Sequence, residues 1–70
     1  MNKLYEGLAE IFEVEPDELT AATLLSEHGW DSLAIVSTIA LFDELYGKEV
    51  DIKSLTDCET VGDLENLAHN

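Results

Sequence analysis

Apolar side chains recur at helical spacing in three stretches of this sequence, and this pattern constrains the fold more than any other feature. The stretches run over roughly residues 3–13, 32–46 and 60–69, and their apolar positions lie three or four residues apart. In chain order these residues are Leu4, Leu8, Ile11 and Phe12, then Ile35, Ile39, Phe42 and Tyr46, then Val61, Leu64, Leu67 and Ala68. The alternation typical of strands is not seen, so the sequence predicts an all-α fold.

A long connection without helical periodicity separates the first two predicted helices. Pro16 ends the first one, because proline lacks the amide hydrogen of a helix interior and forces the preceding residue out of the α region. Eighteen residues, from Val14 to Asp31, follow before the next helix. Loops of this length in a compact domain are usually functional or disordered. Leu19, Leu24 and Leu25 give this loop apolar anchors, so we expect it to pack over the core.

Local signals delimit the remaining helices. Gly47 follows the second apolar stretch and can take the positive φ that closes a helix. Thr60, with an acid three residues later, has the pattern of a capping box that starts the last helix. Residues 50–55 predict a short helical turn with Ile52 and Leu55 on the same side. We therefore expect a small four-helix bundle, with three longer helices and one short helix around a single core.

The chain length and its cysteine content limit the domain organisation. A chain of 70 residues buries only about 60% of its unfolded surface, so we expect a single domain over residues 1–70. We also expect a monomer. Cys58 is the only cysteine and cannot form an intrachain disulfide. Without a secretory signal or an apolar run near the roughly 20 residues that span a bilayer, we expect a protein of the reducing cytoplasm that does not insert into membranes.

The charge balance narrows the possible partners. Sixteen acidic residues face three lysines and no arginine, which gives a formal net charge of −13. The hydrophobic fraction of 46% exceeds that of disordered acidic tails, so we expect a folded protein nevertheless. Nucleic acids and anionic lipid surfaces would repel such a surface, whereas basic protein surfaces would attract it. Proteins with basic surfaces are the expected partners.

Residues Gly29 to Leu33 form the stretch most informative about chemistry. Here a serine hydroxyl, that of Ser32, falls on the first residues of a helix, directly after a glycine turn and the long loop. Free amides and the positive end of the helix dipole favour a phosphate ester at such a position. Helix capping by Asp31 or Ser32 explains the same residues without any chemistry, and local physics alone leaves both interpretations open.

The sequence Gly29-Trp30-Asp31-Ser32-Leu33 resembles the Gly-x-Asp-Ser-Leu attachment signature of acyl carrier proteins. The segment Thr60-Val61-Gly62-Asp63-Leu64 is also similar to the C-terminal segment of this family, and the helix lengths and the long loop match over essentially all 70 residues. The resemblance implies a covalent 4′-phosphopantetheine arm on Ser32. It also implies that Asp31 assists the phosphopantetheinyl transferase that attaches the arm.

A carrier of this kind performs no catalysis of its own. It would hold an acyl or aminoacyl group as a thioester on the arm and present it to a loading enzyme and to a downstream synthase or transferase. In this interpretation Leu33 is the apolar contact beside the arm, and Asp31, Asp43 and Glu44 are charged contacts for basic enzyme surfaces. The alternative is an unmodified acidic interaction domain, in which the wide apolar surface of residues 33–46 docks another protein.

The sequence also departs from the carriers of fatty acid synthases. Ala34 and Ser37 stand where those carriers usually have acids, His28 replaces an apolar residue, and Trp30 is bulkier than the frequent alanine. These differences favour a polyketide, a specialised acyl product or an activated amino acid as the cargo.

Other chemistry is poorly supported by the sequence. Cys58 has no neighbouring base, so a half-buried structural thiol is favoured over a nucleophile. The histidines and the cysteine lack zinc spacing, and the acids of residues 13–18 lack the ligand pattern of a calcium loop. A small hydrolase would need a base, an oxyanion site and more chain than is present.

Overall fold

A computed structural model describes residues 3–69 and contains four α-helices with two short 3₁₀ turns. The helices are α1 (Lys3–Phe12), α2 (Ser32–Tyr46), α3 (Ile52–Thr56) and α4 (Val61–His69), and the turns η1 (Pro16–Glu18) and η2 (Leu25–His28) lie in the α1–α2 connection. No strand occurs within the described residues, where one isolated bridge pairs Leu24 with Thr60. The predicted all-α architecture, with three longer helices and one short one, is confirmed.

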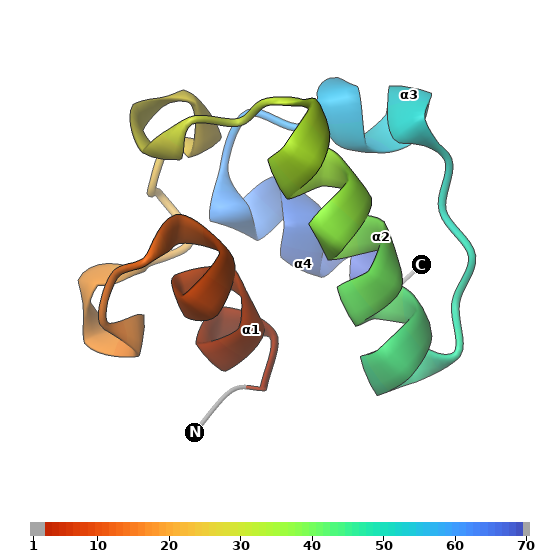
Figure 1. Ribbon diagram of the computed structural model, residues 1–70, viewed down its shortest axis with the longest axis horizontal. Coiled ribbons are helices and arrows are strands. Elements are labelled where there is room, and N and C mark those ends of the chain that lie inside the picture. Colours follow the sequence, from red (N-terminus) through yellow and green to blue (C-terminus); the bar gives the residue numbers. More distant parts are fainter. Residues whose placement is uncertain (1–2, 70) are drawn as a thin grey trace.

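The helices surround one core, and Figure 1 shows α3 beside the beginning of α2, with α4 behind α2. Each longer helix contributes most of the apolar stripe predicted for it, but Tyr46, at the end of the α2 stripe, is 39% exposed, so its prediction was wrong. The side chains with less than 2% exposure include Leu4 and Leu8 of α1, Phe42 of α2, Leu55 of α3 and Val61 and Leu64 of α4. Thr38, in the middle of α2, is also fully buried, and its hydroxyl donates to the Ala34 carbonyl at 2.8 Å. Its polar group is thus satisfied inside its own helix.

The first helix ends earlier than the proline at position 16 requires. It stops at Phe12 because Glu13 adopts a left-handed conformation with φ of 60°, and the Val14 amide then donates to the Ala9 carbonyl at 2.9 Å. The Glu13 amide also donates to the Glu10 carbonyl at 3.3 Å, so the two bonds form a Schellman motif, here built on a residue that carries a Cβ. Pro16 instead opens η1, where its fixed φ suits the first position of a turn.

The long α1–α2 connection is tied to the beginning of α4. The Leu25 amide donates to the Glu59 carbonyl at 2.9 Å, and the Val61 amide donates to the Thr23 carbonyl at 3.0 Å. Leu19 and Leu25 are buried as predicted, whereas Leu24 is 43% exposed. The expectation that all three leucines anchor the loop was therefore wrong for Leu24, whose backbone pairs with Thr60, just before α4, while its side chain is exposed.

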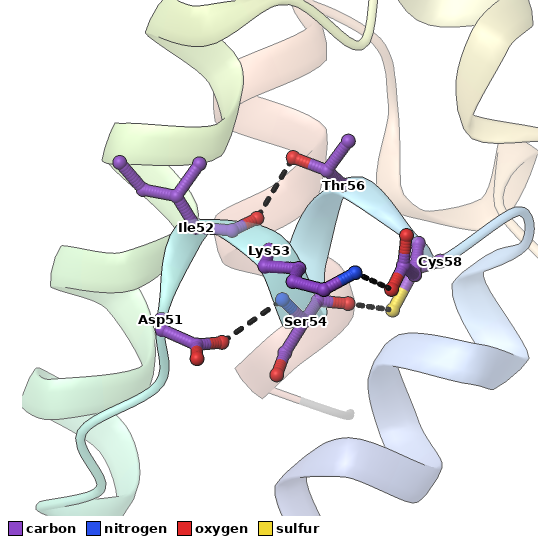
Figure 2. A network of polar contacts seen from close by, with 7 residues as sticks. Asp51, Ile52, Lys53, Ser54, Thr56 and Cys58 are labelled. Atoms are coloured by element: carbon purple, nitrogen blue, oxygen red, sulfur yellow. Dashed lines mark hydrogen bonds and ion pairs between the residues drawn. The ribbon is translucent and has the colours of Figure 1, made fainter.

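The short helix α3 is held by its own polar contacts, which Figure 2 shows. The Ser54 amide donates to the Asp51 carboxylate at 2.9 Å, and the Thr56 hydroxyl donates to the Ile52 carbonyl at 2.8 Å. Leu55 is fully buried, but Ile52 is 58% exposed, so the prediction that both lie on the same side was wrong. The side chain of Ile52 extends away from these polar contacts (Figure 2).

Candidate functional site

The beginning of α2 is shaped by a turn that only some residues can adopt. Gly29 ends η2 in a left-handed conformation, with φ of 72°, and the Asp31 amide donates to its carbonyl at 2.8 Å. A Cβ at position 29 would meet nothing within 4 Å, so the positive φ, rather than crowding, favours glycine. The turn delivers Asp31 in extended conformation to the N-cap of α2.

Asp31 caps the helix, and the hydroxyl of Ser32 takes no part in the capping. The Ala34 amide donates to Asp31 Oδ1 at 3.0 Å, which is the N-cap bond of α2. Ser32 is the first helical residue and is exposed, and its hydroxyl forms no hydrogen bond within residues 3–69. Of the two residues considered for capping, the structure assigns that role to Asp31. The Ser32 hydroxyl is thus free to react.

A cluster of aromatic side chains packs against the turn at Gly29. His28 stacks on Phe12 with ring centroids 5.1 Å apart, and Trp30 meets the same ring edge-on at 6.1 Å. The Trp30 indole N–H also donates to the Leu55 carbonyl of α3 at 3.1 Å. Trp30 therefore joins the beginning of α2 to α1 on one side and to α3 on the other.

Two clefts flank the beginning of α2. The cleft on the α3 side has a volume of about 360 Å³ and includes Trp30, Ser32, Val36 and Ile52 in its lining. The cleft on the α1 side has a volume of about 330 Å³, and the Leu33 side chain lines it together with residues of α1 and η2. Ser32 itself borders only the first of these, where the side chains of Trp30, Val36 and Ile52 make an apolar surface beside its hydroxyl.

The predicted contact residues all lie on the exposed face of α2. Leu33 is 76% exposed, and Asp43 and Glu44 are exposed three turns further along. At a rise of about 1.5 Å per residue, Asp43 lies about 16 Å from Ser32 along the helix axis. The structure therefore does not bring Asp43 or Glu44 next to the serine. Ala34 is only 6% exposed and Ser37 is half-buried, so the two residues that stand in place of acids contribute little to the exposed surface of α2.

Cys58 has the environment of a structural thiol. It is half-buried, donates to the Ser54 carbonyl at 3.4 Å (Figure 2), and lies near two carboxylates. Burial, together with the charges of Asp63 and Asp57, raises the pKa of the Cys58 thiol and so disfavours the reactive thiolate. Within residues 3–69 no cluster of three or more histidine, cysteine or acidic side chains is arranged to hold a metal ion, and no helix there is long and apolar enough to cross a membrane.

The described residues thus form a small helical domain with an exposed serine at the start of its longest helix. The protein family described as phosphopantetheine attachment site matches residues 2–68. The chain therefore belongs to this family, whose members carry a covalent 4′-phosphopantetheine group on a serine. No curated protein matches the chain closely enough to count as a relative.

The geometry at Ser32 is compatible with such a group. The hydroxyl is exposed and uncommitted, open space lies in front of Gly29, and the first amides of α2 precede the intrahelical hydrogen bonds. Sequence reasoning missed two residues of this region, Val36 and Ile52. Spacing placed Val36 on a broad apolar surface and Ile52 beside Leu55, and neither pattern indicates that both line the cleft at Ser32.

Proposed function

We propose that Ser32 carries the 4′-phosphopantetheine arm and that the protein is a carrier for acyl or aminoacyl groups. The observation that supports this most is the division of roles at the start of α2, where Asp31 caps the helix and leaves the Ser32 hydroxyl exposed. Of the other serines, Ser37 and Ser54 are half-buried, and Ser26 is exposed but lies in η2, away from the attachment signature.

Attachment of the arm would be a phosphoryl-type transfer to the serine. Ser32 Oγ would attack the phosphorus of coenzyme A that bears the pantetheine, forming the Oγ–P bond while the pyrophosphate P–O bond breaks. Adenosine 3′,5′-bisphosphate leaves, and a base of the transferase takes the hydroxyl proton. Asp31 is exposed and uses only Oδ1 to cap the helix, which supports a contact between its other carboxylate oxygen and the transferase at this step.

The chemical contribution of the carrier is proximity. A cargo held as a thioester on a tether meets each enzyme at high effective concentration, so successive reactions become local events. A loading enzyme and a downstream synthase or transferase, in lipid, polyketide or specialised metabolite biosynthesis, would supply the catalytic residues. Leu33, Asp43 and Glu44 support docking, since all three are exposed on the same face of α2 as Ser32.

Modification in vitro tests this proposal directly. The protein is incubated with coenzyme A and a broad-specificity phosphopantetheinyl transferase and weighed by intact-protein mass spectrometry. Wild type should gain one phosphopantetheinyl group, and Ser32→Ala should stay folded and gain none. Ser26→Ala, which removes the other exposed serine, is the matched control and should be modified like wild type. Equal modification of Ser32→Ala, or none of wild type, would remove the carrier function.

The unmodified interaction domain remains the second candidate. It is favoured by the exposed apolar side chains of α2, Leu33 and Val36, which are 76% and 53% exposed. Mass spectrometry of protein purified from its native cell separates the two candidates, because only a carrier would bear an arm and a cargo. The cytoplasmic location and the monomeric state stay predictions.

A further inference from the structure

We propose that a groove between α1 and α2 binds a basic amphipathic helix of a partner protein. The residues that line this α1–α2 groove include Gly7, Glu10 and Ile11 of α1 and Ser37 and Leu41 of α2. Ser32 does not line it, since that residue borders the cleft on the α3 side of α2. The inference therefore goes beyond the proposed function, because a partner held in the α1–α2 groove would leave Ser32 accessible to enzymes.

The first observation is that two neighbouring clefts form one continuous groove. The cleft of about 330 Å³ beside η2 and a second cleft of about 320 Å³ further along α2 share Ile11 and Ser37 in their linings. On α2 the lining residues recur at helical spacing, so one face of the helix forms one wall of the groove; they are Ala34, Ser37, Leu41 and Glu44. The rise from Ala34 to Glu44 is about 15 Å, which corresponds to about three turns of a helix.

The groove is open because small residues line its middle. At Gly7 the two helices pack closely, since a Cβ there would come within 2.5 Å of Leu41 Cδ1. Ser37 is half-buried, and its hydroxyl forms no hydrogen bond within residues 3–69. The half-buried side chains of Ile11 and Leu41 supply apolar surface beside these small residues. A partner side chain can therefore occupy space that the protein itself leaves unfilled.

The second observation is the charge along both sides of the groove. The exposed acids Glu10 and Glu13 lie on the α1 side, and the exposed acids Asp31 and Glu44 lie on the α2 side. None of the three lysines lines either cleft. The cleft at Ser32, by contrast, has Asp31 as the one acid in its lining. Acids on both sides of an apolar floor are complementary to a partner that carries basic side chains on both sides of an apolar stripe.

The shape of the groove favours a helix as the occupant. A helix satisfies its own backbone hydrogen bonds, whereas an extended segment needs a sheet edge, and no strand occurs within the described residues. A third helix also packs naturally against the groove between two others, as in a helical bundle. The partner helix would place apolar side chains, three or four residues apart, against Ile11 and Leu41, with lysine or arginine on both flanks. A second copy of this chain is disfavoured, because two proteins of net charge −13 repel each other.

A designed peptide provides the probe. It has about 14 residues, or about four helical turns, with leucines along one face, lysines on both flanks and alanine elsewhere. A second peptide of the same composition has its leucines distributed around the helix, so that they share no face. Binding of each labelled peptide to the full-length protein is measured by fluorescence anisotropy at about 0.15 M sodium chloride, where distant charges are screened.

Three variants separate binding in the groove from attraction by the net charge. Glu10→Gln with Glu44→Gln neutralises one acid on each side of the groove. Asp17→Asn with Glu59→Gln removes the same charge from exposed positions outside it and is the matched control. Ser37→Gln places a larger neutral side chain in the middle of the groove. Thermal unfolding followed by circular dichroism verifies that each variant is folded.

The amphipathic peptide should bind wild type at least about tenfold more tightly than the rearranged peptide. Its affinity should fall about fivefold in the variant of Glu10 and Glu44, stay within about twofold in the control variant, and fall about tenfold in Ser37→Gln. Equal losses in the two charge variants, an unchanged affinity of folded Ser37→Gln, equal binding of the two peptides or no binding at all would overturn the groove as a docking site. The assay requires no modification of Ser32, so such a result leaves the carrier function intact, and a failure of modification leaves the groove intact.

Discussion

Asp31 combines a structural role that the structure shows with a functional role that the family resemblance implies, and two substitutions separate them. Asp31→Ala removes the acceptor for the Ala34 amide, whereas Asp31→Asn retains an acceptor oxygen but loses the charge. Asparagine and aspartate cap helices about equally well, and loss of a cap to alanine costs about 1 kcal/mol. The free energy of unfolding should therefore fall only in Asp31→Ala, which loses the acceptor. The rate of modification should fall in both variants, because both lose the charge.

The expected change in melting temperature follows from the size of the chain. For 70 residues, an unfolding entropy of about 2.1 cal/mol/K per residue gives about 150 cal/mol/K in total. A loss of about 1 kcal/mol should then lower the Tm of Asp31→Ala by about 7 °C, measured by circular dichroism. Asp31→Asn should stay within about 2 °C of wild type, since only the interaction of its charge with the helix dipole is lost.

The functional part is measured as the rate of phosphopantetheinyl transfer to each variant. Loss of one charge-assisted contact, about 1.4 kcal/mol, should slow the modification of Asp31→Asn about tenfold. Asp51 provides the matched control, because it caps α3 with the same type of bond, at 2.9 Å to the Ser54 amide. Asp51→Ala should lose stability but be modified at the normal rate.

Two results would refute this reasoning. An unchanged Tm of Asp31→Ala would show that the capping bond does not stabilise the fold. Equal modification rates of Asp31→Asn and wild type would show that the carboxylate charge serves only the helix.

Three further predictions concern the fold. Glu13→Gly should raise the free energy of unfolding by up to about 1 kcal/mol, and with it the Tm, because Glu13 has φ of 60° and glycine adopts a positive φ without strain. Glu13→Ala should not raise the Tm. Burial, with the hydrogen bond to Glu65, raises the pKa of Tyr5 to about 12, so its stabilising contribution should persist below pH 10 and disappear as the pH rises towards 12; an absorbance titration should lose this late phase in Tyr5→Phe. Sodium chloride should raise the Tm, because the net charge of −13 makes the acids repel one another, and a Tm that falls with added salt would contradict this.

The capping signals show how much local sequence can predict. Gly47 has φ of 59° at the end of α2, as expected, and the Asp63 amide donates to the Thr60 hydroxyl at 3.2 Å while the Asp63 carboxylate accepts from the Thr60 amide at 3.2 Å. These bonds join residues within three or four positions of one another, so the residue types and their spacing suffice to predict them.

The site could be predicted where it depends on local sequence. The prediction failed where the site depends on contacts between residues far apart in the chain. The place of Ser32 at the start of a helix follows from local sequence. The bond between the Trp30 indole and the Leu55 carbonyl joins residues 25 positions apart, and no pattern in the chain indicates it. The same holds for the hydrogen bond from the Tyr5 hydroxyl to Glu65, which links α1 to α4 at 2.6 Å.

The sequence by itself determined the number and kind of helices, the places where most of them end, and the serine at the head of α2. Hydrophobic spacing and capping chemistry act over one or two turns, which is why they can be read without a structure. Only the tertiary structure decided that Ile52 faces outwards and shares a cleft with Ser32 and Val36. A five-residue helix such as α3 is too short for its apolar spacing to define a buried face. Its orientation depends on the burial of Leu55 and on the bond from Trp30, and both are set by packing between distant parts of the chain.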